Sequence, residues 1–294
     1  CGKSALCKSI MKLLPKTAKI KSGKILVNGA DITDYTEKNM SRLRGELFSM
    51  VFQDPMTSLN PTITVGKQIG EAVRIHNKKM SRGQIRKRVI ELMQLVEIDR
   101  PEERIRQYPH EFSGGMRQRA VMAIALAGNP KILFADEPTT ALDVTIQAQI
   151  LDVFRRIQKK LEMATVFISH DLGVVAGVAD RVAVMYAGKI VEIGTAEEIF
   201  YDPRHPYTWG LLQSLPVLSE GKEWLPTLPG MPPTLIHPPK GDAFAERNVY
   251  AMKIDYEKEP PMFRITDTHY AATWLLDERA PKVKVPTGGR RDGK

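Results

Sequence analysis

Short apolar runs alternate with amphipathic stretches along the first two thirds of the chain. The runs end at turn-forming residues and predict buried strands at residues 47–52, 132–135, 164–169 and 182–186. The stretches between them repeat apolar residues every three or four positions. They predict helices at residues 3–14, 62–80, 81–96, 114–127, 145–161 and 174–179. This alternation predicts an α/β fold with a mainly parallel sheet.

Two segments depart from the alternation. Residues 23–33 place Asn28-Gly29 between two short apolar runs, which predicts a β-hairpin. Residues 62–106 have helical patterns and no strand pattern. We therefore expect an inserted helical subdomain that extends over about residues 62–128.

The C-terminal third has a different composition. Prolines crowd the stretch after Leu215, at positions 216, 226, 229, 232, 233, 238 and 239. Because central strands and helices exclude proline at that density, residues 206–240 are expected to form a linker or an extended segment. Residues 241–281 regain aromatic side chains and are expected to form a small appended unit, followed by a basic tail at 282–294.

Composition narrows the class of protein. The 294 residues are 43% hydrophobic and 26% charged, which excludes a wholly disordered chain. No apolar run is long enough to span a bilayer. The net charge of +9 is consistent with binding to nucleic acid or to an anionic membrane. Because a good part of this charge lies in the basic tail, we prefer the interpretation of a mildly basic globular protein with a solvated tail. Cys1 and Cys7 alone cannot build a disulfide framework, which favours a reducing cytosol.

The first residues carry the second half of a phosphate-binding loop. Gly2-Lys3-Ser4 opens the first predicted helix, where backbone N–H groups can hold a phosphate, the lysine can reach its oxygens and the serine can bind Mg²⁺. Taken alone, the tripeptide is equally consistent with a lysine in the first turn of an ordinary helix.

Two carboxylates follow the apolar run at 132–135. Asp136 and Glu137 stand where ligands bind in open α/β sheets. An aspartate there can hold Mg²⁺, and the adjacent glutamate can deprotonate a water molecule that attacks a phosphate. The alternative is two solvated charges at a strand end. Gln53 and His170 also follow apolar strands. They are either a surface glutamine and a histidine that caps the next helix, or ligands of the same phosphate site.

Ser113-Gly114-Gly115 opens another predicted helix. Ser113 suits an N-cap, and two glycines allow a ligand to approach the backbone closely. This segment is either a capped helix with a flexible entry or a second anion site. Two separated anion sites would suit a dimer in which each chain completes the other's site.

The order of these motifs resembles a known family. Gly2-Lys3-Ser4, Gln53, Ser113-Gly114-Gly115, Asp136-Glu137, Ala141-Leu142-Asp143 and His170 are similar in order and spacing to the nucleotide-binding subunit of an ATP-binding cassette (ABC) transporter. The resemblance runs from Cys1 to about Tyr207. It implies an α/β fold in which residues 1–205 are a P-loop NTPase of the ABC ATPase type, with the inserted helical subdomain and a small C-terminal appendage.

The resemblance implies a role for each phosphate-binding and metal-binding residue. Gly2, Lys3 and Ser4 hold the phosphates of ATP, and Ser4, Gln53 and Asp136 surround Mg²⁺. The family's first strands, its adenine-stacking aromatic residue and the first glycine of the phosphate loop have no counterpart here. We therefore expect an N-terminally truncated chain that binds and hydrolyses ATP poorly as given.

The resemblance also assigns the catalytic and partner-facing residues. It implies that Glu137 is the general base, with Gln53 and His170 as further catalytic residues near the γ-phosphate and the attacking water. Ser113-Gly114-Gly115 contacts the ATP held by a partner subunit, and Asp143 lies at the dimer seam, where it also contributes to nucleotide binding.

Further motifs narrow the subfamily to the oligopeptide/dipeptide permease ATPases. Residues 112–119, 204–208 and 228–233 resemble that group, and the form of the C-terminal unit resembles that of its Gram-positive oligopeptide branch. Many relatives carry four cysteines for an iron–sulfur cluster in the C-terminal unit. Those positions align here with Asp242, Asn248, Asp255 and Thr273, none of which supplies a thiolate, so we predict no cluster.

The subfamily implies the cellular setting. We expect an ATPase at the cytoplasmic face of the membrane that pairs with a paralogous ATP-binding subunit, two membrane permease subunits and an extracellular peptide-binding protein, and that binds no nucleic acid. Two alternatives stay open: a soluble ABC ATPase acting on nucleic acid or the ribosome, and an inactive truncated remnant.

Overall fold

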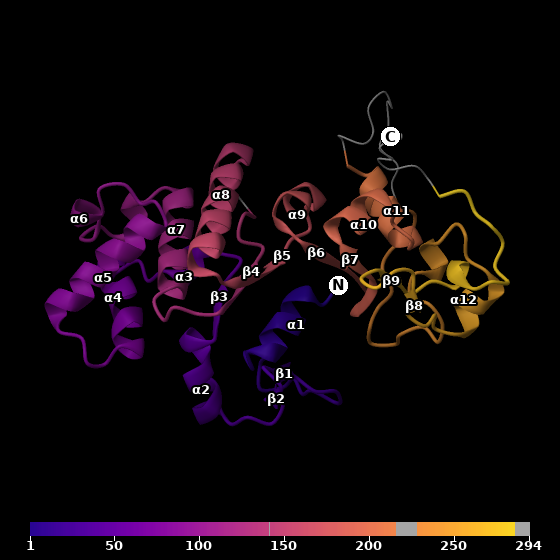
Figure 1. The fold of residues 1–294 in the computed structure, drawn as a ribbon, viewed down its shortest axis with the longest axis horizontal. Helices are drawn as coiled ribbons and strands as arrows, with labels where there is room; N and C mark the ends of the chain where they lie inside the picture. The colour runs from indigo at the N-terminus through magenta and orange to yellow at the C-terminus, as the bar shows by residue number, and fades with distance from the viewer. Residues whose placement is uncertain (141, 216–227, 286–294) are drawn as a thin grey trace. The chain divides into compact units, whose positions relative to one another are not determined.

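The structure is a computed structural model, which describes residues 1–140, 142–215 and 228–285. These residues divide into two compact units (Figure 1). The N-terminal unit is Ser4–His170, and the C-terminal unit contains Cys1–Lys3 and the residues from Asp171 onward. Among the described residues, no helix has both the length and the apolar character needed to cross a bilayer.

A three-stranded parallel sheet forms the centre of the N-terminal unit. Its strand order is β3-β4-β5, with β3 at Phe48–Val51, β4 at Ile132–Asp136 and β5 at Ala164–Ile168. Phe48 pairs with Ile132, and Ile132 pairs with Ala164, so the three carboxyl ends meet at one edge. Central strand β4 is buried along nearly its whole length, as expected of a strand covered on both faces.

Helices without strands fill the segment between β3 and β4. They are α3 (Pro55–Ser58), α4 (Val65–His76), α5 (Arg82–Leu95), α6 (Pro101–Arg104), the 3₁₀ turn η1 (Pro109–Glu111) and α7 (Gly114–Ala125). The helix predicted at 81–96 is confirmed: Ser81 and Gln84 form a capping box, and Val89, Leu92 and Met93 are buried. Helices α4, α5 and α7 share one apolar core with β4 and with α8 (Val144–Leu161).

A second apolar cluster packs the first helices of the N-terminal unit against its sheet. It joins α1 (Lys3–Ile10), through Cys7, to α2 (Glu37–Glu46), through Met40, and to Phe48 and Phe134 of the sheet. The predicted hairpin is confirmed as β1 (Leu26–Val27) and β2 (Ala30–Asp31). Asn28 and Gly29 both have positive φ angles, as a two-residue hairpin turn of this kind requires.

The C-terminal unit contains an antiparallel sheet of order β6-β7-β9-β8. Its strands are β6 (Arg181–Tyr186), β7 (Lys189–Thr195), β8 (Phe263–Arg264) and β9 (Tyr270–Ala271). Its helices are α9 (Leu172–Val178), α10 (Ala196–Tyr201), α11 (Pro206–Gln213), α12 (Lys253–Glu257) and the 3₁₀ turns η3 (Ala245–Arg247) and η4 (Trp274–Leu276). Val184, Tyr186, Val191, Ile199 and Phe244 form its core.

The structure differs from the sequence prediction in three places. The strand predicted at 182–186 is present, but it lies in the antiparallel sheet. The reason is local: Ala187 and Gly188 have positive φ angles and form a tight turn that pairs β6 with β7. The helix predicted over 3–14 ends at Ile10, before Lys12 with its positive φ angle.

The third difference concerns the predicted linker at 206–240, which begins with helix α11. His205 caps this helix and Pro206 occupies its first turn. Proline is tolerated there because the backbone N–H groups of a first turn have no partner within the helix. The described residues 228–240 contain no helix or strand. Residue 141 of the Ala141-Leu142-Asp143 motif, linker residues 216–227 and tail residues 286–294 lie outside the described residues.

Candidate functional site

The polar residues that follow the three parallel strands converge at one edge of the sheet. Gln53 follows β3, Asp136 ends β4, Glu137 comes next, and His170 follows β5. The structure therefore brings these four residues together at that edge. This edge is where open α/β sheets bind ligands.

The Glu137 carboxylate is the centre of this group. Its Oε2 accepts hydrogen bonds from Nε2 of Gln53 at 2.8 Å and from Oγ1 of Thr140 at 3.1 Å. Its Oε1 lies 3.2 Å from Nδ1 of His170. The Glu137 side chain is 18% exposed, so three neighbours hold a largely buried carboxylate in one orientation while it still reaches solvent.

The Glu137 backbone explains how this side chain reaches its place. Glu137 has a φ angle of +47°, in the left-handed region, and its N–H donates to the carbonyl of Ile168 at 3.0 Å. That hydrogen bond continues the pairing of β4 with β5 by one residue beyond the strand end. A left-handed backbone conformation is uncommon at a non-glycine residue and costs free energy, so the surrounding structure must stabilise it. Such residues are enriched at functional sites.

Ser4 and Asp136 form a second polar pair. Oγ of Ser4 donates to Oδ1 of Asp136 at 2.7 Å, and Asp136 is 3% exposed. A hydroxyl and a carboxylate at hydrogen-bond distance are hard oxygen donors of the kind that Mg²⁺ binds, so these two residues fit that ion. Ser4 lies in the first turn of α1, which begins at Lys3. Gly2 has a φ angle of +90°, which favours glycine there.

Ser113 caps helix α7. Its hydroxyl accepts a hydrogen bond from the N–H of Met116, and both Ser113 and Gly114 are exposed. Gly115 is buried, and a Cβ atom there would lie 2.7 Å from Cγ2 of Ile146 in α8. Gly115 is therefore required for the close packing of α7 on α8, in addition to any role toward a ligand.

Asp143 caps helix α8 in the same way. Its carboxylate accepts the N–H of Ile146 at 2.9 Å, and the next residue, Val144, is 81% exposed. Ser113 and Asp143 thus open two helices of the N-terminal unit at exposed positions.

Thr140 was not identified from the sequence. It lies one turn after Glu137, and its hydroxyl donates to the Glu137 carboxylate. The signal was present, since a hydroxyl residue three positions after a strand-end glutamate can reach back to it. The neighbouring Thr139 carries the same hydroxyl two positions after Glu137, so the sequence alone does not choose between the two threonines.

The four positions aligned with cluster cysteines are all buried in the C-terminal unit. Each side chain accepts a backbone N–H within its own loop: Asp242 from Phe244, Asn248 from Tyr250, Asp255 from Met252 and Thr273 from Leu275. They are hard oxygen donors engaged with backbone, so they do not fit an iron–sulfur cluster, which is held by thiolates. Burial raises the pKa of Asp242 to about 6, and the nearby Asp255 carboxylate acts in the same direction.

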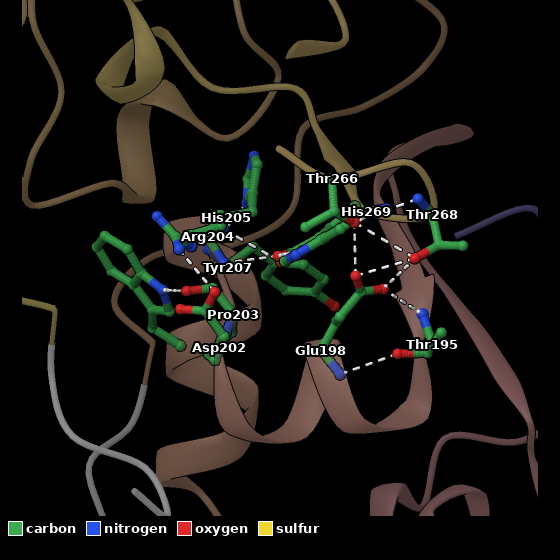
Figure 2. A network of polar contacts seen from close by, with 12 residues as sticks. Thr195, Glu198, Asp202, Pro203, Arg204, His205, Tyr207, Thr266, Thr268 and His269 are labelled. Atoms are coloured by element: carbon green, nitrogen blue, oxygen red, sulfur yellow. Dashed lines mark hydrogen bonds and ion pairs between the residues drawn. The ribbon is translucent and has the colours of Figure 1, made fainter. Parts of the chain in front are cut away.

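A second buried carboxylate organises the segment at 202–208. Glu192 of β7 is fully buried and accepts the backbone N–H of Arg204 at 2.6 Å and that of His205 at 3.1 Å. Nε2 of His269 lies 2.8 Å from Oε1 of Glu192. Figure 2 shows this network beside Glu198, whose carboxylate accepts the hydroxyls of Thr266 and Thr268. Burial lowers the pKa of His205 to about 4, so its imidazole is neutral at physiological pH.

Comparisons with known proteins place the chain in a family. Residues 1–140 match the ABC transporter family, and residues 191–254 match the C-terminal region of oligopeptide/dipeptide transporters. The oligopeptide transport ATP-binding protein OppD of Bacillus subtilis is 61% identical over 287 residues, which cover 97% of this chain and 80% of that protein. The chain belongs to the oligopeptide/dipeptide family of ABC transporter ATP-binding proteins.

Other members and a solved structure agree with this assignment. The dipeptide transport ATP-binding protein DppD of Lactococcus lactis is 57% identical over 282 residues, which cover 96% of this chain and 81% of that protein. The dimeric, post-hydrolysis structure of the ATP-binding cassette MJ0796, bound to ADP and Pi, matches with a TM-score of 0.58 and 26% identity. The match covers 66% of this chain and 81% of that one. The predicted ABC ATPase fold is therefore confirmed, and with it the family to which the motifs pointed.

Proposed function

We propose that this ABC protein binds and hydrolyses MgATP to power the import of oligopeptides or dipeptides. In this proposal it acts at the cytoplasmic face of the cell membrane, with two permease subunits, an extracellular peptide-binding protein and a paralogous ATP-binding subunit. Residues 1–205 form the nucleotide-binding domain, and residues 241–281 are the appended unit of the oligopeptide permease type.

The arrangement around Glu137 carries the proposal. Glu137 is a general base that accepts a proton from the water attacking the γ-phosphate, because its carboxylate is held at the sheet edge and still reaches solvent. Gln53 orients the carboxylate and the water through its amide. His170 contacts a γ-phosphate oxygen through its exposed imidazole.

The residues that would hold the phosphates and the metal include Asp136, which precedes Glu137 in the sequence, and Ser4, which donates a hydrogen bond to Asp136. Gly2, Lys3 and Ser4 hold the phosphates at the start of α1, where backbone N–H groups are unpaired within the helix. Ser4, Asp136 and Gln53 hold Mg²⁺. When bound, Mg²⁺ would neutralise part of the charge on the β- and γ-phosphates.

The second anion site serves a dimer. Ser113, Gly114 and Gly115 present the exposed start of α7 to the ATP held by the partner subunit, and Asp143 lies at the seam between the subunits.

Peptide uptake into proteoliposomes tests the proposal. The full-length protein is reconstituted with its permease subunits, its paralogue and the peptide-binding protein, and labelled tripeptide is added outside. Uptake that requires MgATP inside and is lost in the Glu137→Gln variant is expected. Uptake that continues without ATP, or unchanged uptake by the variant, would contradict the proposal.

A further inference from the structure

Residues 204–208, one of the segments that resemble the oligopeptide permease group, lie in the C-terminal unit. Glu137 and its hydrogen-bond partners Gln53 and Thr140 lie in the N-terminal unit. Cys1–Lys3, at the start of the phosphate-binding loop, belong to the C-terminal unit as well. A short series of contacts within this one unit joins residues 204–208 to that loop.

The backbone of residues 204–207 is held at three points (Figure 2). The buried Glu192 carboxylate accepts the N–H of Arg204 at 2.6 Å and that of His205 at 3.1 Å. Nδ1 of His205 then accepts the N–H of Tyr207 at 3.0 Å. Burial lowers the pKa of His205 to about 4, so this nitrogen keeps the lone pair that the contact needs. The start of α11, and with it the side chain of Tyr207, is therefore fixed.

The Tyr207 ring packs against the end of strand β6. Its centroid lies 4.7 Å from that of Tyr186, the last residue of β6, which is 2% exposed. Phe244 meets both rings, at 5.4 Å from Tyr207 and 5.2 Å from Tyr186. The Arg247 guanidinium lies 5.8 Å from the Tyr186 ring centroid and donates to its hydroxyl at 3.3 Å. Tyr207, Phe244 and Arg247 thus enclose Tyr186.

The turn that follows Tyr186 contacts the phosphate-binding loop. Ala187 and Gly188 form this turn with φ angles of +47° and +83°. The N–H of Gly188 donates to the carbonyl of Cys1 at 3.1 Å. A Cβ atom built at Gly2 would lie 3.5 Å from Cα of Gly188, so the turn packs directly against the loop.

This hydrogen bond sets the direction of one backbone N–H group. The peptide bond between Cys1 and Gly2 is planar, and the described residues contain no cis peptide. In a trans peptide the C=O and N–H groups point to opposite sides. Because the Cys1 carbonyl is held toward Gly188, the N–H of Gly2 points away from the turn. Gly2 immediately precedes α1, where N–H groups without helical partners can bind a phosphate.

We propose that Tyr207 is a positioning residue for nucleotide binding. Through Tyr186 it fixes the turn at Gly188, which holds the N–H of Gly2 toward a phosphate. The proposal rests on the proposed function, in which residues 2–4 hold the phosphates of ATP. The affinity for MgATP then depends on residues 204–208, whereas the proton transfer to the general base in the other unit does not. A change at Tyr207 therefore raises KM and leaves kcat unaltered.

The alternative role of residues 204–208 is to anchor the appended unit and nothing more. In that case, the loss of any comparable ring contact in the unit would affect nucleotide binding alike, through stability. Phe263 and Trp274 provide the matched contact, with ring centroids 6.1 Å apart. Among the described ring contacts, neither of these two residues meets Tyr186.

MgATP titrations and steady-state hydrolysis by the full-length protein test the proposal. The wild type is compared with Tyr207→Leu, with the conservative Tyr207→Phe and with the control Phe263→Leu, and unfolding midpoints are measured on all four. Tyr207→Leu is expected to raise Kd and KM for MgATP about tenfold, with kcat within about twofold of the wild type. Tyr207→Phe keeps the ring, so this variant and Phe263→Leu are expected to bind MgATP like the wild type.

Gly188→Ala tests the second contact and decides the outcome if Tyr207→Leu does not fold. Its methyl group would lie 3.8 Å from Leu235 and so has room, but a φ angle of +83° strains an alanine and shifts the turn. It is expected to raise Kd about tenfold as well. A wild-type Kd for folded Tyr207→Leu or for Gly188→Ala would overturn the proposal. An equal loss of affinity in Phe263→Leu would also overturn it.

Lys3→Ala separates this proposal from the proposed function. Loss of MgATP binding by Lys3→Ala, together with wild-type affinity in Tyr207→Leu and Gly188→Ala, would overturn the positioning role alone. Wild-type affinity in Lys3→Ala would overturn the phosphate site on which both proposals depend.

Discussion

Gln53 and Glu137 are 84 positions apart in the sequence, and Nε2 of Gln53 donates a hydrogen bond to Oε2 of Glu137 at 2.8 Å. The contact exists because β3 and β4 are parallel neighbours in register, which brings their carboxyl ends to one edge. Two segments that the helical insert separates along the chain therefore meet at the proposed catalytic carboxylate. A change in the position of Gln53 would be transmitted directly to Glu137.

The Gln53→Ala variant is expected to hydrolyse ATP about 10- to 100-fold more slowly than the wild type. The reason is loss of orientation, since the Glu137 carboxylate would keep Thr140 and His170 but lose its amide partner. Steady-state phosphate release by the full-length protein measures the effect. An unchanged kcat would show that the Gln53 contact has no part in the reaction.

The Ser4→Ala variant is expected to weaken the Mg²⁺-dependent part of ATP binding about tenfold. The change removes the hydroxyl that lies 2.7 Å from Asp136 and leaves the charge of the site unaltered. ATP titrations with and without Mg²⁺ separate this effect from loss of phosphate binding. A variant that loses affinity equally in both titrations would argue against a metal role for Ser4.

The Glu192→Ala variant is expected to lower the free energy of unfolding by about 3 kcal/mol. Removing the carboxylate leaves the backbone N–H groups of Arg204 and His205, the latter buried, and the imidazole of His269 without their acceptor. Denaturant unfolding gives the value, and Glu197→Ala, at an exposed position on α10, is the matched control. A cost below 1 kcal/mol for Glu192→Ala would show that the network is not needed.

The Asp242→Asn variant is expected to change how stability depends on pH. Burial raises the pKa of Asp242 to about 6, so the folded state prefers the protonated carboxyl and the unfolded chain ionises first as the pH rises. The stabilising effect of that proton is complete below about pH 4 and is lost between about pH 4 and pH 6. Asparagine keeps the acceptor for the Phe244 N–H but does not titrate.

The difference in free energy of unfolding between Asp242→Asn and the wild type measures this effect. It is expected to rise in favour of the variant by about 2 kcal/mol from pH 4 to pH 7, as a shift of roughly two pKa units implies over this range. The neighbouring Asp255, Glu259 and Lys189 remain in both proteins, so their titration largely cancels. A difference that does not change over this range would contradict the raised pKa.

The Gly115→Ala variant is expected to destabilise the protein by about 1–3 kcal/mol. The added methyl group would lie 2.7 Å from Cγ2 of Ile146, so α7 and α8 would have to separate. Gly83→Ala is the control: it also lies in a helix, but its added methyl group meets nothing within 4 Å, and we expect it to stabilise slightly. Equal unfolding midpoints for the two variants would contradict the packing argument.

Local patterns predicted much of the N-terminal unit. Strands β3, β4 and β5 are apolar runs that end at turn residues, and the Asn28-Gly29 hairpin and the Ser81 helix start depend on residues close together in sequence. The convergence of Gln53, Glu137 and His170 followed from one further step, because the carboxyl ends of parallel strands share an edge. These local preferences predict the structure correctly because the tertiary contacts favour the same conformations.

The C-terminal unit was predicted less well because its contacts are distant in sequence. Strand β9 pairs with β7, so that Glu192 lies opposite Ala271, and no local pattern indicates this. No strand is predicted over residues 189–195, and only the fold shows that Glu192 is buried with His269. Helix α11 was not predicted, because it lies at the start of the proline-rich stretch that was assigned to the linker.

The central claim is that Glu137 is the base for ATP hydrolysis. The most direct test is the steady-state rate of phosphate release by the full-length wild-type protein and by Glu137→Gln, with MgATP binding measured on both. The amide keeps the size of the side chain but accepts no proton, so we expect kcat to fall at least about 100-fold while MgATP still binds. Equal rates of hydrolysis by the two proteins would contradict the account.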